Sequence, residues 1–518
     1  MNTTEFLSIA SAVVPDRLAL VFEQKRITFQ ELEGRVNRLA NAFAEFGVEP
    51  GDRIATLQVN SNEQVEAYFA AAKLDAVYVP LNFRARADEL IYMLNDSGAK
   101  VLLAGSRYAD HVRSFAPDLE TVEHFVALDT HVEGWPFYES ILASTAGEDH
   151  FPDGDDDDLT AILFTAGTTG EPKGVMLSHE SFSSYVLTNV TPSDPEEEGR
   201  NILTVPLYHI AAMQAVMSAV YGGRTLVIQR QFEPGEWMQL VERERANRAM
   251  MVPTMLKMLM DHPEFGRYDL SSLDVITYGA APMPLEVIRR AIEKFPGARF
   301  INAFGQTETA ATITMLPPDD HVLEGTSEEI EVKLKRLTSI GRPLEDVEVR
   351  IVGEDGHPVD QGEVGEIVAS GSRLMKGYWH QEAATAETIR NGWLYTGDLG
   401  YFDEDGYIYL AGRAKDFIKR GGEMVSPQEV ELVLQSHPAI DEAAVIGVPD
   451  VDWGERVRAV VVLKEGQTST EDELSEYCRV RLSSFKKPES VVFIDRLPRN
   501  ALGKVLKRVL REEYGGPV

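Results

Sequence analysis

The sequence is short of cysteine, of basic charge and of long apolar runs. Its 518 residues include one cysteine, Cys478, which excludes an intramolecular disulfide and a cysteine metal cluster. Asp and Glu outnumber Lys and Arg by 83 to 50, for a formal net charge of -33. This acidic balance argues against nucleic acid or an anionic membrane as the main partner, because both require a basic face.

The N-terminal segment and the most apolar segment of the sequence do not resemble an export signal or a transmembrane helix. The opening segment, MNTTEFLSIASAVVPDR, has no basic stretch followed by an apolar one. The most apolar segment, Val205 to Gly222, contains His209 and Gln214 and is too polar for a transmembrane helix. We therefore expect a cytoplasmic protein without a transmembrane segment, and we leave peripheral contact with a membrane open.

Length and periodicity predict an α/β fold of at least two domains. A chain of 518 residues exceeds what one hydrophobic core usually organises. Apolar positions at helical spacing over 29–48 are followed by short apolar runs, an alternation typical of α/β architecture with largely parallel sheets. These runs are Arg53–Val59, Ala76–Pro80, Lys100–Ala104, His124–Leu128 and Leu159–Thr165.

The pattern of predicted elements changes near residue 400, where turn sequences separate short β-rich runs. After Gly412 the pattern is that of a compact α+β unit, with a helix starting near Pro427. We predict a large N-terminal domain of stacked α/β sheets with a β-rich subdomain over 1–412. A hinge at 413–416 then leads to a small mobile α+β domain over 417–518.

A loop rich in glycine and threonine follows the apolar strand in the segment 159–174, LTAILFTAGTTGEPKG. Glycines let backbone N–H groups turn toward an anion, and threonine hydroxyls and a lysine add donors. Lys173 is followed by Gly174, so this is not a Walker loop, and no dinucleotide-binding fingerprint follows. A surface turn is the alternative to a phosphate-binding loop made of Thr165, Ala166, Gly167, Thr168, Thr169, Gly170 and Lys173.

Several further motifs occur in an order and at separations that resemble the adenylate-forming superfamily. This group includes acyl-CoA synthetases, firefly luciferase and peptide-synthetase adenylation domains, and the resemblance covers essentially the whole chain. Ala166 stands where the family commonly has serine, and Met424 stands where it often has asparagine. The motifs are TYGAAPMP (277–284), NAFGQTE (302–308), YTGDLG (395–400), GRAKDFIKRGG (412–422) and PRNALGKVLKR (498–508).

The resemblance implies an ATP site and a metal ligand. Thr307 would contact the α-phosphate, and Glu308 would hold Mg²⁺ together with phosphate oxygens, which suits the preference of Mg²⁺ for oxygen ligands. Asp398 would accept the ribose hydroxyls, and Arg413 would contact the ribose or the phosphates. The remaining ATP-binding candidates are Gly279, Ala280, Ala281, Ala303, Phe304, Gly305 and Gln306.

The C-terminal motif implies a catalytic lysine. Joining a carboxylate to the α-phosphate of ATP brings two anions together, and a cation such as Lys504 between them would offset their repulsion. The resemblance also places Lys415 at the hinge. It assigns the CoA-facing side of the small domain to Lys419, Arg420, Gly421 and Gly422.

The segment from Ser484 to Arg511 is basic within an acidic protein. Eight basic residues face two acidic ones, a local net charge of +6. A positive field here would suit the phosphates of ATP and CoA. The alternative is a helical face that balances acidic neighbours.

The acyl side of the site is expected at PLYHIAAM (206–213). The family often has an aromatic residue or histidine beside the acyl carbonyl, so His209 is a candidate for positioning and gating. A general base is not needed, because a carboxylic acid is already ionised near pH 7. The following residues are apolar and lack the aspartate that amino-acid-activating domains use, which favours a fatty, alicyclic or aryl acid.

These observations predict an AMP-forming acid–CoA ligase that uses ATP, Mg²⁺ and coenzyme A. One rival is an adenylating enzyme that delivers the acyl group to a carrier-protein thiol or to oxygen. Another is a non-catalytic nucleotide-binding scaffold. The acid itself, and the choice between a monomer and a homodimer, stay open.

Overall fold

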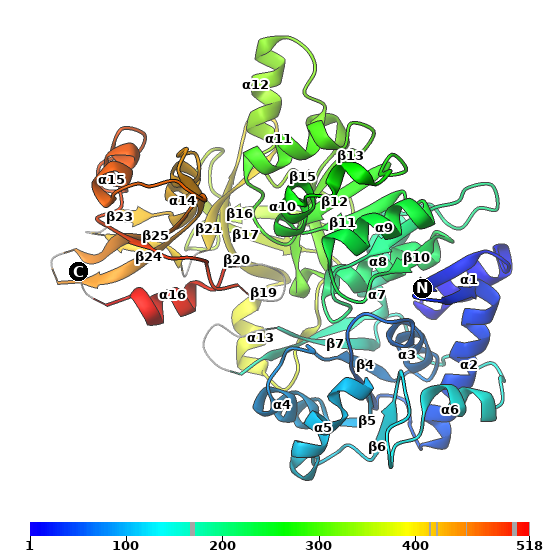
Figure 1. Cartoon of the computed structure of the whole chain (residues 1–518). Helices are drawn as coiled ribbons and strands as arrows, with labels where there is room; N and C mark the ends of the chain where they lie inside the picture. The colour runs from blue at the N-terminus through cyan, green and yellow to red at the C-terminus, as the bar shows by residue number, and fades with distance from the viewer. Residues whose placement is uncertain (166–170, 414–415, 421–422, 452, 500–504, 517–518) are drawn as a thin grey trace.

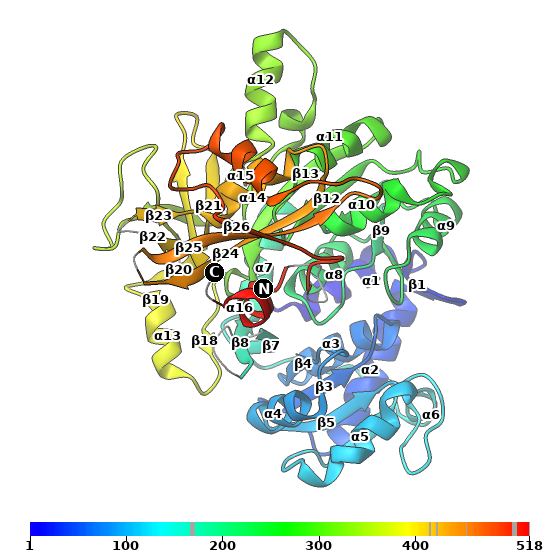
Figure 2. The same ribbon diagram turned by 60° about the vertical axis from the view of Figure 1, so that its left-hand side comes forward.

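The computed structural model describes residues 1–165, 171–413, 416–420, 423–451, 453–499 and 505–516. Its strands form four sheets, of which three belong to the large N-terminal part and one to the C-terminal part (Figures 1 and 2). The mixture of parallel sheets, covering helices and an antiparallel subdomain confirms the predicted α/β class. Among the described residues, no helix combines the length and the apolar character needed to cross a membrane.

The largest sheet has nine strands, and its central strands are parallel. Its order is β15-β14-β13-β12-β11-β9-β10-β1-β2. The strands are β1 (Leu18–Phe22), β2 (Lys25–Thr28), β9 (Arg200–Leu203), β10 (Thr225–Ile228), β11 (Arg248–Met251), β12 (Val275–Gly279), β13 (Arg299–Gln306), β14 (Ala311–Leu316) and β15 (Arg342–Pro343).

The second sheet has seven strands in the order β18-β8-β7-β4-β3-β5-β6. Its strands β4, β3, β5 and β6 are parallel neighbours, whereas β7 and β8 form an antiparallel pair. The strands are β3 (Arg53–Leu57), β4 (Val77–Pro80), β5 (Ala99–Ala104), β6 (His124–Ala127), β7 (Leu159–Thr165), β8 (Lys173–Ser178) and β18 (Gly377–Tyr378).

The other two sheets are smaller. The β-rich subdomain contains β16 (Glu348–Val352), β17 (Gly365–Ser370), β19 (Ile389–Arg390), β20 (Trp393–Phe402) and β21 (Ile408–Arg413). The C-terminal sheet contains β22 (Ile418–Arg420), β23 (Glu423–Val425), β24 (Ile440–Asp450), β25 (Gly454–Leu463) and β26 (Ser490–Phe493). The proposed domain boundary therefore falls between two sheets that share no strand.

Helices cover both faces of the nine-stranded and seven-stranded sheets, as expected for strands that are buried on two faces. Those of the large part are α1 (Thr4–Val13), α2 (Phe29–Glu45), α3 (Asn62–Lys73), α4 (Ala87–Ser97), α5 (Ala109–Phe115), α6 (Tyr138–Ser144), α7 (His179–Asn189), α8 (Ile210–Tyr221), α9 (Pro234–Glu244), α10 (Pro253–Asp261), α11 (Leu285–Lys294), α12 (Ser327–Arg336) and α13 (Glu382–Thr388). The C-terminal part adds α14 (Pro427–Gln435), α15 (Glu471–Arg479) and α16 (Lys507–Tyr514).

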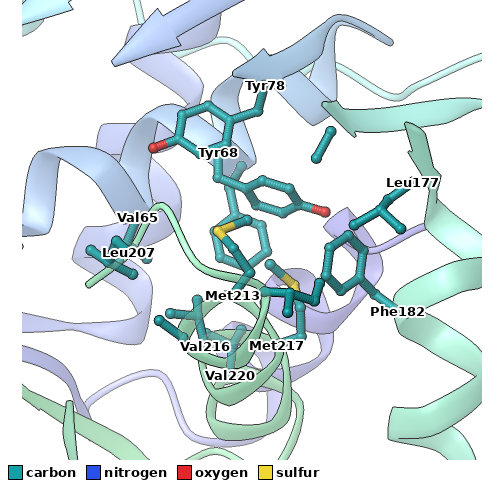
Figure 3. Packing of buried hydrophobic residues seen from close by; sticks show 14 of the residues in the cluster. Val65, Tyr68, Tyr78, Leu177, Phe182, Leu207, Met213, Val216, Met217 and Val220 are labelled. Carbon is teal, nitrogen blue, oxygen red and sulfur yellow. The ribbon is translucent and has the colours of Figure 1, made fainter. Parts of the chain in front are cut away.

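Helix α8 has two faces that serve different purposes. Met213, Val216, Met217 and Val220 recur at helical spacing and are buried in the main core, where they pack near Tyr68 and its neighbours (Figure 3). The opposite face carries Ala211, Gln214, Ala215 and Ser218, and these residues line a cleft. The core therefore fixes the rotation of α8, and this rotation decides which side chains reach the cleft.

The small C-terminal part contacts the large part beside the predicted hinge. Lys257 of α10 forms an ion pair with Asp441 of β24 at 2.6 Å, and the Ser426 hydroxyl donates to the Ala411 carbonyl. The hinge itself stays a prediction, since residues 414 and 415 lie outside the described part of the chain.

Candidate active site

A cleft of about 2150 Å³ runs between the large and small parts of the chain and along one face of the nine-stranded sheet. It brings together side chains that are far apart in the sequence. Most of the described site candidates line it: Thr165, Lys173, His209, Gly279, Ala280, Ala281, Ala303, Phe304, Gly305, Gln306, Thr307, Glu308, Asp398 and Arg413.

The predicted phosphate loop connects the antiparallel strands β7 and β8. Thr165 at the end of β7 pairs with Lys173 at the start of β8, and its hydroxyl donates to the Lys173 carbonyl at 3.4 Å. The strand register thus sets both ends of the loop at the cleft. Residues 166–170, which include five of the candidates, lie outside the described residues.

Tyr378 links Lys173 to Glu308. The Lys173 Nζ lies 4.7 Å from the centroid of the Tyr378 ring, a cation–π contact. The Tyr378 hydroxyl donates a hydrogen bond of 2.9 Å to the Glu308 carboxylate. Burial, together with the nearby Glu308 charge, raises the pKa of Tyr378, so the hydroxyl stays protonated as a donor. Sequence reasoning missed Tyr378, because a tyrosine after a glycine carries no signal of its own.

The turn that carries Thr307 and Glu308 depends on two close backbone contacts. A Cβ atom on Gly305 would lie 1.6 Å from the Ala311 carbonyl oxygen, and one on Gly279 would lie 2.1 Å from that of Ala303. Both positions therefore require glycine. Ala280 has a positive φ of 63°, a conformation that costs free energy in any non-glycine residue and is often found at functional sites.

The two predicted ribose-side residues are paired with each other. The Arg413 Nε lies 2.8 Å from the Asp398 carboxylate, on neighbouring strands β21 and β20. Gln306 donates from its amide to the Thr396 carbonyl at 3.2 Å. This bond ties the Thr307–Glu308 turn to the strand that carries Asp398, so both motifs are held in a fixed relation.

The described side chains of the cleft suit Mg²⁺, which needs few protein ligands, better than a metal ion that is coordinated by protein side chains alone. Glu308 brings one carboxylate to the Lys173 side of the cleft. Across the described ranges, no group of three or more His, Cys, Asp or Glu side chains is placed to hold a metal. A single carboxylate suits Mg²⁺, which is commonly held by one or two carboxylates together with substrate phosphates.

His209 stands immediately before α8, beside the ring of Tyr208 at a centroid separation of 4.2 Å. Burial, with a smaller contribution from the Arg84 charge, lowers the pKa of His209 to about 3, so the imidazole is neutral at pH 7. Its Nε2 atom is buried and has no hydrogen-bond partner among the described residues. A neutral imidazole at this place agrees with a positioning role.

The basic segment of the small part is largely neutralised, which corrects the expectation of a strong positive field. Five of its eight cations form ion pairs with carboxylates of the small part or, for Arg511, of the hinge segment. The pairs are Lys486–Glu429 at 2.8 Å, Arg499–Glu442 at 2.9 Å, Lys507–Glu431 at 2.7 Å, Arg508–Glu512 at 2.6 Å and Arg511–Asp416 at 2.7 Å. The alternative, a face that balances acidic neighbours, describes these residues better. Lys504 lies outside the described residues.

The predicted CoA-facing residues differ among themselves. Lys419 is exposed, whereas the Arg420 side chain is buried, paired with Glu489 and donates to the Phe485 carbonyl. Neither Lys419 nor Arg420 lines the cleft in this arrangement, so their CoA-facing role stays a prediction. Lys415, Gly421 and Gly422 lie outside the described residues.

Comparison with known proteins agrees with this geometry. Residues 8–379 match the family model of AMP-binding enzymes, and residues 429–504 match that of the AMP-binding enzyme C-terminal domain. The chain belongs to the AMP-binding enzyme family. This membership confirms the predicted adenylate-forming superfamily.

Relatives of this AMP-binding enzyme span nearly its whole length. It is 38% identical over 497 residues to a feruloyl-CoA synthase of Amycolatopsis sp, covering 94% of each chain. It is 35% identical over 513 residues to the long-chain-fatty-acid–CoA ligase FadD13 of Mycobacterium tuberculosis, covering 98% of this chain and 97% of that one. The structure of ATP-bound MatB from Rhodopseudomonas palustris superposes with a TM-score of 0.88 at 31% identity over 99% of both chains.

Proposed function

We propose that this AMP-binding enzyme is an AMP-forming acid–CoA ligase, which converts a carboxylic acid and ATP into an acyl-adenylate and then transfers the acyl group to coenzyme A. The observation that carries the proposal is the shared cleft. Lys173, Glu308 and Asp398 line it together with the face of α8 that carries Ala211, Gln214, Ala215 and Ser218. Family membership and the activities that name the feruloyl-CoA synthase and FadD13 relatives support it.

In the first half-reaction a carboxylate oxygen attacks the α-phosphorus of ATP, and the bond to the pyrophosphate group breaks. Lys173, the threonine-rich loop and Thr307 donate to phosphate oxygens. Lys504 places a cation between the two reacting anions. Fixed donors and cations of this kind stabilise the charge that develops in phosphoryl and nucleotidyl transfer.

Mg²⁺, held by Glu308 and phosphate oxygens, would supply further positive charge at the phosphates. Tyr378 fixes one oxygen of Glu308 through its hydroxyl and places its ring against Lys173. Asp398 accepts the ribose hydroxyls, and Arg413 holds Asp398 in place. The nucleotide is thereby held at its phosphates and at its ribose.

In the second half-reaction the sulfur of CoA attacks the acyl carbon, and AMP leaves with the oxygen that bridged it to the acyl group. We place this step after a rotation of the small domain, residues 417–518, about the hinge at 413–416. The rotation withdraws Lys504 and presents Lys419, Gly421 and Gly422 to CoA. Such a conformational step lets one cleft serve two reactions.

The test is pyrophosphate exchange into ATP over a panel of fatty, alicyclic and aryl acids, measured beside CoA-thioester formation. Acid-dependent exchange together with thioester formation is the expected result. Exchange without thioester formation would instead favour a carrier-protein thiol or oxygen as the acceptor. Silence of both assays across the panel would favour a nucleotide-binding scaffold and contradict the proposal.

The remaining parts of the proposal concern the setting of the enzyme. We place it in the cytoplasm, where ATP and CoA are available, with an apolar carboxylic acid as its substrate and no nucleic-acid partner. A homodimer is compatible with the proposal and is tested by sedimentation of the full-length chain.

A further inference from the structure

The cleft does not end at the nucleotide site. From the carboxyl ends of the parallel strands, where Gly279 and Ala280 lie, it continues along the face of the nine-stranded sheet to the opposite edge. Arg224 and Arg248 line this far end, at the start of β10 and β11. The two strands flank β9, so their backbones lie about 10 Å apart and both guanidinium groups can reach one ligand between them.

Neither arginine is neutralised by an ion pair with a carboxylate in the described part of the chain, unlike the cations of the C-terminal segment. Burial, with a smaller contribution from the Arg248 charge, lowers the pKa of Arg224 to about 10. Glu197, which is exposed, is a carboxylate whose charge acts on both arginines. Asp274, near Arg248, is already paired with Arg299 at 2.7 Å. One positive charge therefore remains uncompensated.

The backbone leaves room for this arrangement. A Cβ atom on Gly199 would lie 2.9 Å from the Arg224 side chain, and one on Gly222 would lie 3.0 Å from its Nε. The Arg224 side chain thus occupies space that a side chain at either glycine would need. Gln214 of α8, which faces the same cleft, is buried, and neither of its amide atoms has a hydrogen-bond partner among the described residues. Buried polar groups usually have partners, so this amide is available to a polar group bound in the cleft.

Two independent measures give the length of the path. Arg248 pairs with Val275, which lies four residues before Gly279 on β12, a distance of about 13 Å at 3.3 Å per residue. A Cβ atom on Gly222 would lie 3.0 Å from the Arg224 Nε and 3.1 Å from the Ser218 carbonyl oxygen, so Ser218 marks the arginine end of the path. His209, immediately before α8, precedes Ser218 by nine residues, about 14 Å at 1.5 Å per residue. An extended acid of this length would hold one end at His209 and the other at the two arginines.

We propose that Arg224 and Arg248 bind a second carboxylate of the substrate, so that the preferred substrate is an extended dicarboxylic acid activated at one end and held by the arginines at the other. This inference rests on the proposed function. It refines the expected apolar acid by adding an anionic end to an apolar middle. Paired arginine donors suit a carboxylate, because charge-assisted hydrogen bonds to guanidinium are short and strong.

The experiment compares kcat/KM for CoA-thioester formation with two series of acids of graded length. In one series the far end is a carboxylate, and in the other it is a methyl group at the same carbon number. The wild-type enzyme should favour the dicarboxylic acid about tenfold or more once the chain spans the path. Arg224→Leu and Arg248→Leu should each remove most of that preference and leave activity on the methyl-ended acids unchanged or higher.

Arg200→Leu is the matched control, because Arg200 neighbours Asn201 on β9 but does not line the cleft. It should keep the preference. The comparison within the wild-type enzyme needs no variant, so a poorly folded mutant does not weaken the test. Activity on methyl-ended acids without any preference for dicarboxylic acids would overturn this inference and leave the proposed function standing. Failure to activate any acid would overturn both.

Discussion

Tyr378 donates its hydroxyl to Glu308 at 2.9 Å while its ring contacts Lys173. One side chain thereby joins the β7–β8 hairpin of one sheet to the Thr307–Glu308 turn of another. Tyr378→Phe keeps the ring and removes the hydroxyl, so Glu308 loses a hydrogen bond worth about 1.5 to 3 kcal/mol for a charged acceptor. We expect the Mg²⁺ concentration needed for half-maximal pyrophosphate exchange to rise about tenfold. Tyr378→Leu should cost more, and equal effects of both variants would show that the hydroxyl is unimportant.

Asp398 should act through the ribose hydroxyls. Asp398→Asn weakens both hydroxyl contacts and leaves Arg413 without its charged partner, so the KM for ATP should rise about tenfold or more. The internal control is 2′,3′-dideoxy-ATP, which lacks both hydroxyls. With this nucleotide the wild type and the variant should differ much less, whereas an undiminished difference would show that Asp398 acts only on the fold.

Lys504 should serve one half-reaction. Lys504→Ala removes a cation from between two anions, and loss of a comparable electrostatic contact costs on the order of 10²- to 10³-fold in rate. Acyl-AMP formation should fall by this amount, measured as pyrophosphate exchange. Thioester formation from supplied acyl-AMP and CoA should remain near the wild-type rate. An equal loss in both assays would refute the assignment of separate cleft states.

Three buried histidines should make stability depend on pH. Burial lowers the pKa of His179 and His321 to about 4, and that of His209 to about 3, from an ordinary value of 6.5. Below about pH 6.5 the unfolded chain therefore binds more protons than the folded one. The free energy of unfolding should fall as the pH drops from 6.5 toward 4, by at most about 1.4 kcal/mol per unit of lowered pKa.

The melting temperature at pH 7 and pH 5 tests this dependence. His321→Gln removes one group that must be held neutral on folding, so the difference between the two pH values should become smaller than in the wild type. His357→Gln, at an exposed position, is the control and should leave the difference unchanged. A pH dependence unaffected by His321→Gln would contradict the account of this residue.

Local patterns were sufficient to predict much of the architecture. The strand ending at Thr165 and the helix starting at Pro427 occur where predicted, because each follows from apolar spacing or a start signal within a few residues. The order of the sheets could not be derived in this way. It depends on pairings between distant strands, such as that between Tyr378 and Val175.

The site shows the same division between local and distant information. Glu308 and Asp398 were found through motifs, and both line the cleft. Tyr378 was missed because its function arises only when β18 pairs with β8. The pairing of Arg420 with Glu489 could not be predicted either, because the partner lies 69 residues further along the chain. A composition count likewise cannot show that Lys507 is paired with Glu431 in the folded protein.

The most direct measurement of the central claim follows the oxygen atoms of the acid. If the carboxylate attacks the α-phosphorus of ATP in this cleft, an acid labelled with oxygen-18 in its carboxylate must leave one labelled oxygen in AMP after thioester formation. Mass spectrometry of the released AMP should find that label. Label in inorganic phosphate, with ADP as the nucleotide product, would show that an acyl phosphate forms instead and would contradict the account.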